Sequence, residues 1–79
     1  MDRAFFEHAL LLALRHIEIG HRNVARQREI VAELGRDGYD TTLARDLLAN
    51  FEELQLIHIA DRDRVLQKLT LLAGVASRG

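Results

Sequence analysis

The chain has 79 residues and a formal charge of −1, with eleven basic and twelve acidic side chains. This length allows one domain, whose single core would give only marginal stability. The absence of cysteine excludes disulfides and thiolate zinc sites. Four aromatic residues in a chain that is 48% hydrophobic favour aliphatic helix packing, and the balanced charge argues against nucleic acid as a partner.

The most apolar segment near the N-terminus is uninterrupted only from Ala9 to Leu14. Such a run is too short for the core of a signal peptide and far too short to span a membrane. We therefore expect residues 1–79 to form one domain of a soluble cytoplasmic protein with no membrane span.

The first predicted helix runs from about residue 3 to residue 37. Its apolar residues recur at alternating spacings of three and four, which is typical of a helix that packs along one line against a partner helix, as in a coiled coil. We call this line of facing residues the seam. In the first helix the predicted seam residues are Phe6, Leu10, Ala13, Ile17, Gly20, Val24, Gln27, Val31 and Leu34.

Residues 38–40 form the predicted turn. Gly38 can adopt the left-handed conformation that ends a helix, and Tyr39 can fold back on Leu34, as in a Schellman motif. Asp40 can then cap the second helix with its carboxylate, with Thr41 as the alternative cap. The chain contains no proline, so this turn alone separates the two helices.

The second predicted helix runs from about residue 41 to residue 76. Its predicted seam, widened by Leu43, Leu48 and Leu66, consists of Leu47, Phe51, Leu54, His58, Val65, Leu69, Leu72 and Ala76. A short connection makes the helices antiparallel neighbours, so facing residues should have numbers that sum to roughly 78. The sequence therefore predicts an all-α fold, an antiparallel two-helix hairpin, with Gly20 opposite His58.

Gly20 needs a structural reason, because a glycine inside a helix costs about 0.5–1 kcal/mol relative to alanine. We expect its missing side chain to admit the His58 ring or a close approach of the helices. His58 is then a buried structural histidine that fixes the register, with Asp61 or Gln27 as its partner. A pH-dependent switch is the alternative role for such a buried imidazole.

Apolar residues near the open end of the hairpin extend well beyond the seam. A helix that is apolar on most sides must be buried on most sides, and one partner helix cannot cover that much surface. A second copy of the chain would cover it, giving a homodimeric four-helix bundle. The predicted interface residues are Phe5, Phe6, Leu10, Leu14, Ile17, Leu69 and Leu72.

The four histidines are the residues that suggest site chemistry. Glu18 and His21 fit the Glu-x-x-His pair that di-iron helical bundles use, and a dimer would carry two copies of it. Glu52 and His58 complete the set of candidate metal ligands. The motif occurs once in the chain and Glu18 lies one step outside the seam, so the pair can also be read as a solvated i,i+3 contact.

We predict no metal, cofactor or catalytic residue for this chain, and no enzymatic activity. The sequence has no nucleophile–base arrangement and no glycine-rich phosphate loop. Moreover, a two-helix hairpin offers no pocket of the size that enzymes use.

The segment Glu18-x-x-His21-Arg22 resembles the phosphoacceptor box of one branch of bacterial histidine kinases, whose dimerisation domain is also a helical hairpin. In those kinases a lysine and an asparagine follow the His-Arg pair, whereas Asn23-Val24-Ala25 follows here. We expect no ATP-binding domain within these 79 residues. The resemblance implies a histidine phosphotransfer module, which together with metal binding forms the alternative function.

A second resemblance covers about residues 16–66. It rests on Arg22-x-Val24-x-x-Gln27-x-x-Ile30-Val31-x-x-Leu34, Asp37-Gly38-x-Asp40-Thr41, Ala44-x-x-Leu47-Leu48-x-x-Phe51-Glu52 and Asp61-Arg62. In these positions the chain resembles a group of small, uncharacterised bacterial helical proteins. The resemblance implies a helical hairpin and brings no activity, substrate or partner. We therefore expect a small homo-oligomeric protein that acts by protein–protein interaction, regulatory interaction included, with itself and an unidentified protein as partners.

Overall fold

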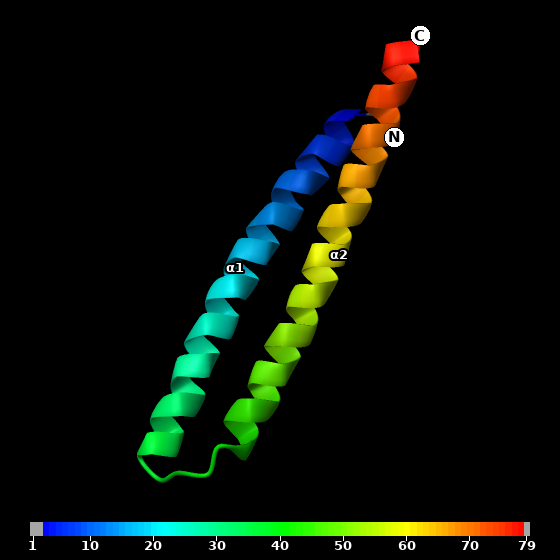
Figure 1. Ribbon diagram of the computed structural model, residues 1–79. Coiled ribbons are helices and arrows are strands. Elements are labelled where there is room, and N and C mark those ends of the chain that lie inside the picture. Colours follow the sequence, from blue (N-terminus) through cyan, green and yellow to red (C-terminus); the bar gives the residue numbers. More distant parts are fainter. Residues whose placement is uncertain (1–2, 79) are drawn as a thin grey trace.

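The computed structural model describes residues 3–78, and over these residues the chain forms two long α-helices. α1 spans Arg3–Arg36 and α2 spans Thr42–Arg78. The helices lie side by side and antiparallel, with the connection at one end and both termini near the other (Figure 1). The molecule is a rod with extents of 65 × 16 × 14 Å. The predicted all-α hairpin is confirmed, with helix bounds within two residues of those expected.

The seam predicted for α1 is confirmed at every position. Ala13, Val24 and Gln27 are buried, and they are the three buried residues in the part of the chain that the structure describes. The other six predicted seam residues of α1 are half-buried. The pattern holds because the spacing of three and four keeps all nine residues on one side of the helix.

The seam predicted for α2 is wrong at Leu47 and Leu54, and two of the three residues predicted to widen it, Leu43 and Leu66, are also exposed, at 84% and 42%. Leu47 and Leu54 are 43% and 46% exposed, whereas Leu48 and Gln55, one residue further along, are half-buried. The half-buried line in α2 consists of Ala44, Leu48, Phe51, Gln55, His58, Arg62, Val65, Leu69 and Leu72. Apolarity favoured the two leucines, but the strict alternation of three and four that runs through Val65, Arg62 and His58 requires Gln55 and Leu48. Ala76 lies among the residues whose side chains are not described.

The predicted register agrees with the contact at Gly20. A Cβ built at Gly20 would lie 3.5 Å from His58 Cδ2, so the predicted pair does meet. Contacts made by longer side chains lie on either side of this register: His58 packs beside His16, with ring centroids 5.3 Å apart, Gln55 Nε2 donates to the carbonyl of Ile17, and Arg28 pairs with Glu52. The difference from the prediction lies in which side of α2 faces α1.

The turn is a Schellman motif that ends α1 at Gly38. The Tyr39 N–H donates to the carbonyl of Leu34 at 2.9 Å and the Gly38 N–H donates to that of Gly35 at 3.2 Å, which is the paired bond pattern of this motif. Gly38 has a φ of 79°, in the left-handed region that glycine adopts most easily. Because the Tyr39 side chain is mostly exposed, the backbone bonds define this stop more than burial of the ring does.

Asp40 caps the start of α2, as predicted. Its Oδ1 accepts hydrogen bonds from the Thr42 N–H at 2.9 Å and from the Thr42 hydroxyl at 2.7 Å. The bond from the Thr42 backbone, and then the one from its hydroxyl, hold the pKa of the Asp40 carboxyl below its ordinary value. The carbonyl of Thr41 accepts the first helical bond, from Arg45, so Thr41 occupies the capping position and Asp40 supplies the capping carboxylate.

We expect Gly38→Ala to lower the free energy of unfolding by about 1 kcal/mol, because a side chain disfavours the left-handed conformation. A Cβ at this position would meet no atom within 4 Å, so the cost is conformational and not steric. Gly35→Ala is the matched control, because Gly35 lies inside α1, where alanine is favoured over glycine. A Cβ at Gly35 would make only an ordinary contact, of 3.9 Å, with Thr41 Cγ2. Urea unfolding should show opposite signs for the two variants; equal effects would contradict the assignment of the helix stop.

Candidate interaction surface

Two glutamines cross-link the helices through hydrogen bonds to backbone carbonyls. Gln27 Nε2 in α1 donates to the carbonyl of Ala44 at 2.9 Å. Gln55 Nε2 in α2 donates to the carbonyl of Ile17, also at 2.9 Å. Each bond uses the second lone pair of a helical carbonyl, so the two amides fix the relative position of the helices without disturbing either helix.

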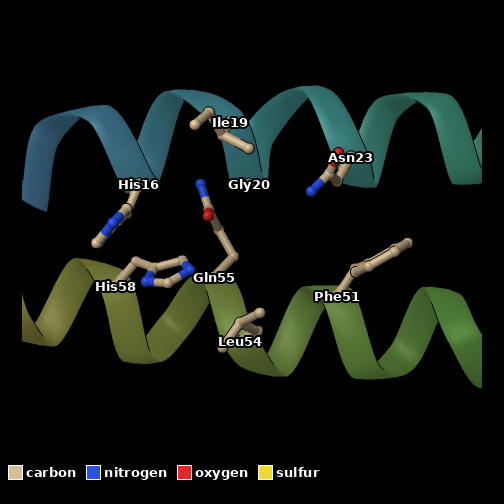
Figure 2. Close-up of a pocket in the computed structure, with 8 residues that line it drawn as sticks. All are labelled: His16, Ile19, Gly20, Asn23, Phe51, Leu54, Gln55 and His58. Carbon is tan, nitrogen blue, oxygen red and sulfur yellow. The ribbon is translucent and has the colours of Figure 1, made fainter.

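The space above Gly20 is filled by Gln55. A Cβ at Gly20 would overlap Gln55 Oε1 and would lie 2.9 Å from Gln55 Cδ, while the nearest His58 atom, Cδ2, would be 3.5 Å away. Glycine therefore admits a side chain from the partner helix, as predicted, but that side chain is first of all Gln55, with His58 next to it. Figure 2 shows the Gln55 amide pointing from α2 toward Gly20.

Gln55 carries an unsatisfied acceptor. Its Oε1 is buried and has no hydrogen-bond partner among the described residues. A buried polar atom left without a partner costs about 1–3 kcal/mol, so native structures usually provide one from the protein, from water or from a bound partner. Oε1 occupies the place of the missing Gly20 side chain between the two helices, where no described residue supplies a donor.

Two histidines lie beside this amide. The rings of His16 and His58 are 5.3 Å apart between centroids, and their planes are tilted by 40°. His58 is half-buried and His16 is exposed. His58 thus occupies the seam as expected, but its neighbour across the interface is His16 and not Gln27 (Figure 2).

Two hollows lie end to end along one side of the hairpin. The first, of about 180 Å³, is lined by four residues of each helix: His16, Ile19, Gly20, Asn23, Phe51, Leu54, Gln55 and His58. The second, of about 280 Å³, is lined by Ala9, Leu12, Ala13, His16, Asp61, Arg64 and Val65. Since His16 lines both hollows, they form one continuous groove between α1 and α2.

Exposed apolar side chains flank this groove. Leu12, Ile19 and Leu54 line it and are 39–47% exposed. Residues seven apart lie on the same side of a helix in this packing. Leu47 therefore shares the side of Leu54, and Ile57 shares the side of Arg64, which lines the second hollow. We call this side the groove face, defined by Leu12, His16, Ile19, Asn23, Leu47, Leu54, Ile57, Asp61 and Arg64.

The other side of the hairpin is marked by an ion pair between the helices. Arg28 Nη2 lies 3.2 Å from Glu52 Oε2. Leu14 and Leu66, each fourteen residues from a member of this pair, share its side, and they are 45% and 42% exposed. We call this side the opposite face, defined by Leu14, Arg28, Glu52 and Leu66.

The candidate metal ligands are not brought together. The carboxylate of Glu18 accepts a hydrogen bond from Arg22 at 2.6 Å, and that of Glu52 pairs with Arg28. His21 is exposed on α1, and His58 lies at the groove. No group of three or more possible ligands that could hold a metal ion is found within residues 3–78. No observation on the described residues favours a metal centre here.

The predicted interface residues divide into two groups. Five of them are half-buried on the seam and hold the two helices of the hairpin together: Phe6, Leu10, Ile17, Leu69 and Leu72. The other two are Phe5, whose ring packs edge-on against Phe6, and Leu14, on the opposite face. The sequence analysis therefore did not predict the groove face as an exposed apolar surface.

Sequence reasoning also missed the roles of His16 and Gln55. His16 lies next to Ile17 of the seam but is one step outside it, which gives no reason to select it. A signal for Gln55 did exist, because it lies four residues after Phe51 and three before His58. Its polarity hid that signal, since a seam is normally sought among apolar residues.

Comparison of the chain with protein families, with curated proteins and with solved structures found no match. Within the described residues, neither helix contains a stretch long and apolar enough to cross a membrane.

Proposed function

We propose that this chain is a self-associating helical-hairpin protein that forms a homodimeric four-helix bundle and acts by protein–protein interaction. The surface of the single chain carries the proposal. One hairpin of 9.0 kDa exposes 6146 Å². A compact folded monomer of that mass exposes about 4,850 Å², so this chain exposes roughly 1,300 Å² more.

That excess is of the size that a stable dimer buries. A standard interface removes about 800 Å² from each partner, and permanent homodimers remove more. Much of the exposed surface is apolar, because thirteen large hydrophobic residues of the described chain are more than a third exposed. Five of them lie along the groove face, and exposed apolar surface that gathers on one side of a protein marks an interaction site. Docking of a second hairpin would supply the second layer that helical domains normally have.

The stability of a lone hairpin supports the same conclusion. Only two apolar side chains of the described chain are buried, Ala13 and Val24, and both are small. Hydrophobic burial contributes about 25 cal/mol per Å², while ordering each residue costs about 1–2 kcal/mol. A second copy would bury the half-exposed leucines and isoleucines and add the missing stabilisation.

Sedimentation equilibrium of the purified chain over a range of concentrations tests the proposal. We expect a mass of twice 9.0 kDa, together with a thermal midpoint that rises with protein concentration, because association stabilises the folded state by mass action. A helical species that remains at 9.0 kDa at every concentration, with a midpoint independent of concentration, would exclude self-association as its function.

A further inference from the structure

We propose that the second copy docks on the groove face, with its own groove face turned inward, so that the interface is formed by Leu12, Ile19, Leu47, Leu54 and Ile57 of both copies around the histidine pair. This inference rests on the proposed self-association and adds which surface carries it. The alternatives are an interface on the opposite face and an interface spread over both faces.

The shape of the groove indicates what fills it. Its two hollows, of about 180 and 280 Å³, are lined mainly by apolar atoms and follow one another between the helices. An elongated apolar space of this kind, flanked by exposed Ile19 and Leu54, suits the side chains of a docking protein. The neighbouring hollow at Leu12 continues the groove along the rod, which suits a second helical hairpin.

A polar group at the groove can also be matched by a second copy. The side chain of Asn23 is exposed and lines the hollow beside Gly20, and an amide both donates and accepts hydrogen bonds. In a twofold dimer each surface faces a copy of itself, so the Asn23 amides of the two copies can pair.

Matched lysine substitutions test the assignment. Ile19→Lys and Leu54→Lys change residues of the groove face that are 47% and 46% exposed, and Leu14→Lys and Leu66→Lys change residues of the opposite face that are 45% and 42% exposed. We expect the first pair to weaken dimerisation at least tenfold in sedimentation, because a charge must be buried. The second pair should leave the dissociation constant within about threefold, as usual for changes outside a binding surface. Circular dichroism checks that each variant stays helical.

Cysteine labelling gives a second measurement that does not depend on disruptive variants. The chain has no cysteine of its own, so Ile19→Cys and Leu14→Cys each introduce a single thiol at sites of nearly equal exposure in the single chain. We expect a maleimide to react several-fold more slowly at position 19 than at position 14 in the dimer, and the two rates to converge on dilution to monomer.

The outcomes separate the two proposals. A wild-type chain that is monomeric would overturn both. A wild-type dimer that dissociates with Leu14→Lys and Leu66→Lys, and that protects position 14 from labelling, would overturn the groove-face assignment while leaving self-association in place. Equal effects of the two pairs, with equal labelling rates, would also overturn it in favour of an interface spread over both faces.

Discussion

Replacing Gly20 with leucine should lower the free energy of unfolding by about 1–3 kcal/mol, the usual cost of overpacking a closely packed interface. The reason is that Gln55 already occupies the space above Gly20, with Gln55 Cδ only 2.9 Å and His58 Cδ2 3.5 Å from a Cβ built there. A leucine side chain must push the Gln55 amide away from the carbonyl of Ile17 and so break the hydrogen bond between the helices. Urea unfolding at one fixed protein concentration measures the change.

A mutant cycle with Gln55 identifies the cause of that loss. In the wild-type background, Gly20→Ala gains about 0.5–1 kcal/mol of helix propensity but displaces the Gln55 amide, whose bond contributes a similar amount. In the Gln55→Ala background nothing remains to be displaced, so Gly20→Ala should be stabilising. Gly74→Ala is the control, because a Cβ at Gly74 meets no atom within 4 Å. If Gly20→Ala has the same effect in both backgrounds, Gln55 is not the neighbour that requires this glycine.

Gln27→Glu should destabilise the hairpin by about 3 kcal/mol at pH 7, in the range of an uncompensated buried charge. Gln27 is 6% exposed, and its Nε2 donates to the carbonyl of Ala44. The introduced carboxylate has nearly the same shape but no hydrogen to donate, and it would face a carbonyl oxygen in a site shielded from water. Gln67→Glu, on an exposed position of α2, is the isosteric control and should change stability little.

The effect of Gln27→Glu should depend on pH in a defined direction. Burial and the need for a donor favour the protonated acid, so the pKa of the introduced carboxyl rises on folding above the unfolded value of about 4.3. The penalty is then fully present above the folded pKa and disappears as pH falls to the unfolded value. Urea midpoints of Gln27→Glu and Gln67→Glu should therefore converge between pH 7 and pH 4. A gap that is the same at both pH values would show that the loss is one of packing and not of charge.

The sequence by itself determined the elements of this fold. The spacing of three and four in α1 placed all nine seam residues on the buried side, and the order Gly38, Tyr39, Asp40 predicted both the helix stop and the cap that the hydrogen bonds show. These features are local. Each acts within a few residues of chain: a left-handed glycine, a capping carboxylate and a repeat along one helix. They can therefore be predicted without knowledge of the helix that packs against them.

Only the tertiary structure decided what faces what. The orientation of α2 about its own axis put Gln55 over Gly20 and placed His58 beside His16. The same orientation leaves Leu47 and Leu54, two leucines that apolarity alone would bury, 43% and 46% exposed, and so forms the groove face. Which side of α2 turns inward depends on hydrogen bonds to carbonyls of the other helix, from Gln27 and Gln55. A helix cannot specify such partners by its own repeat, because they exist only once both helices are in place.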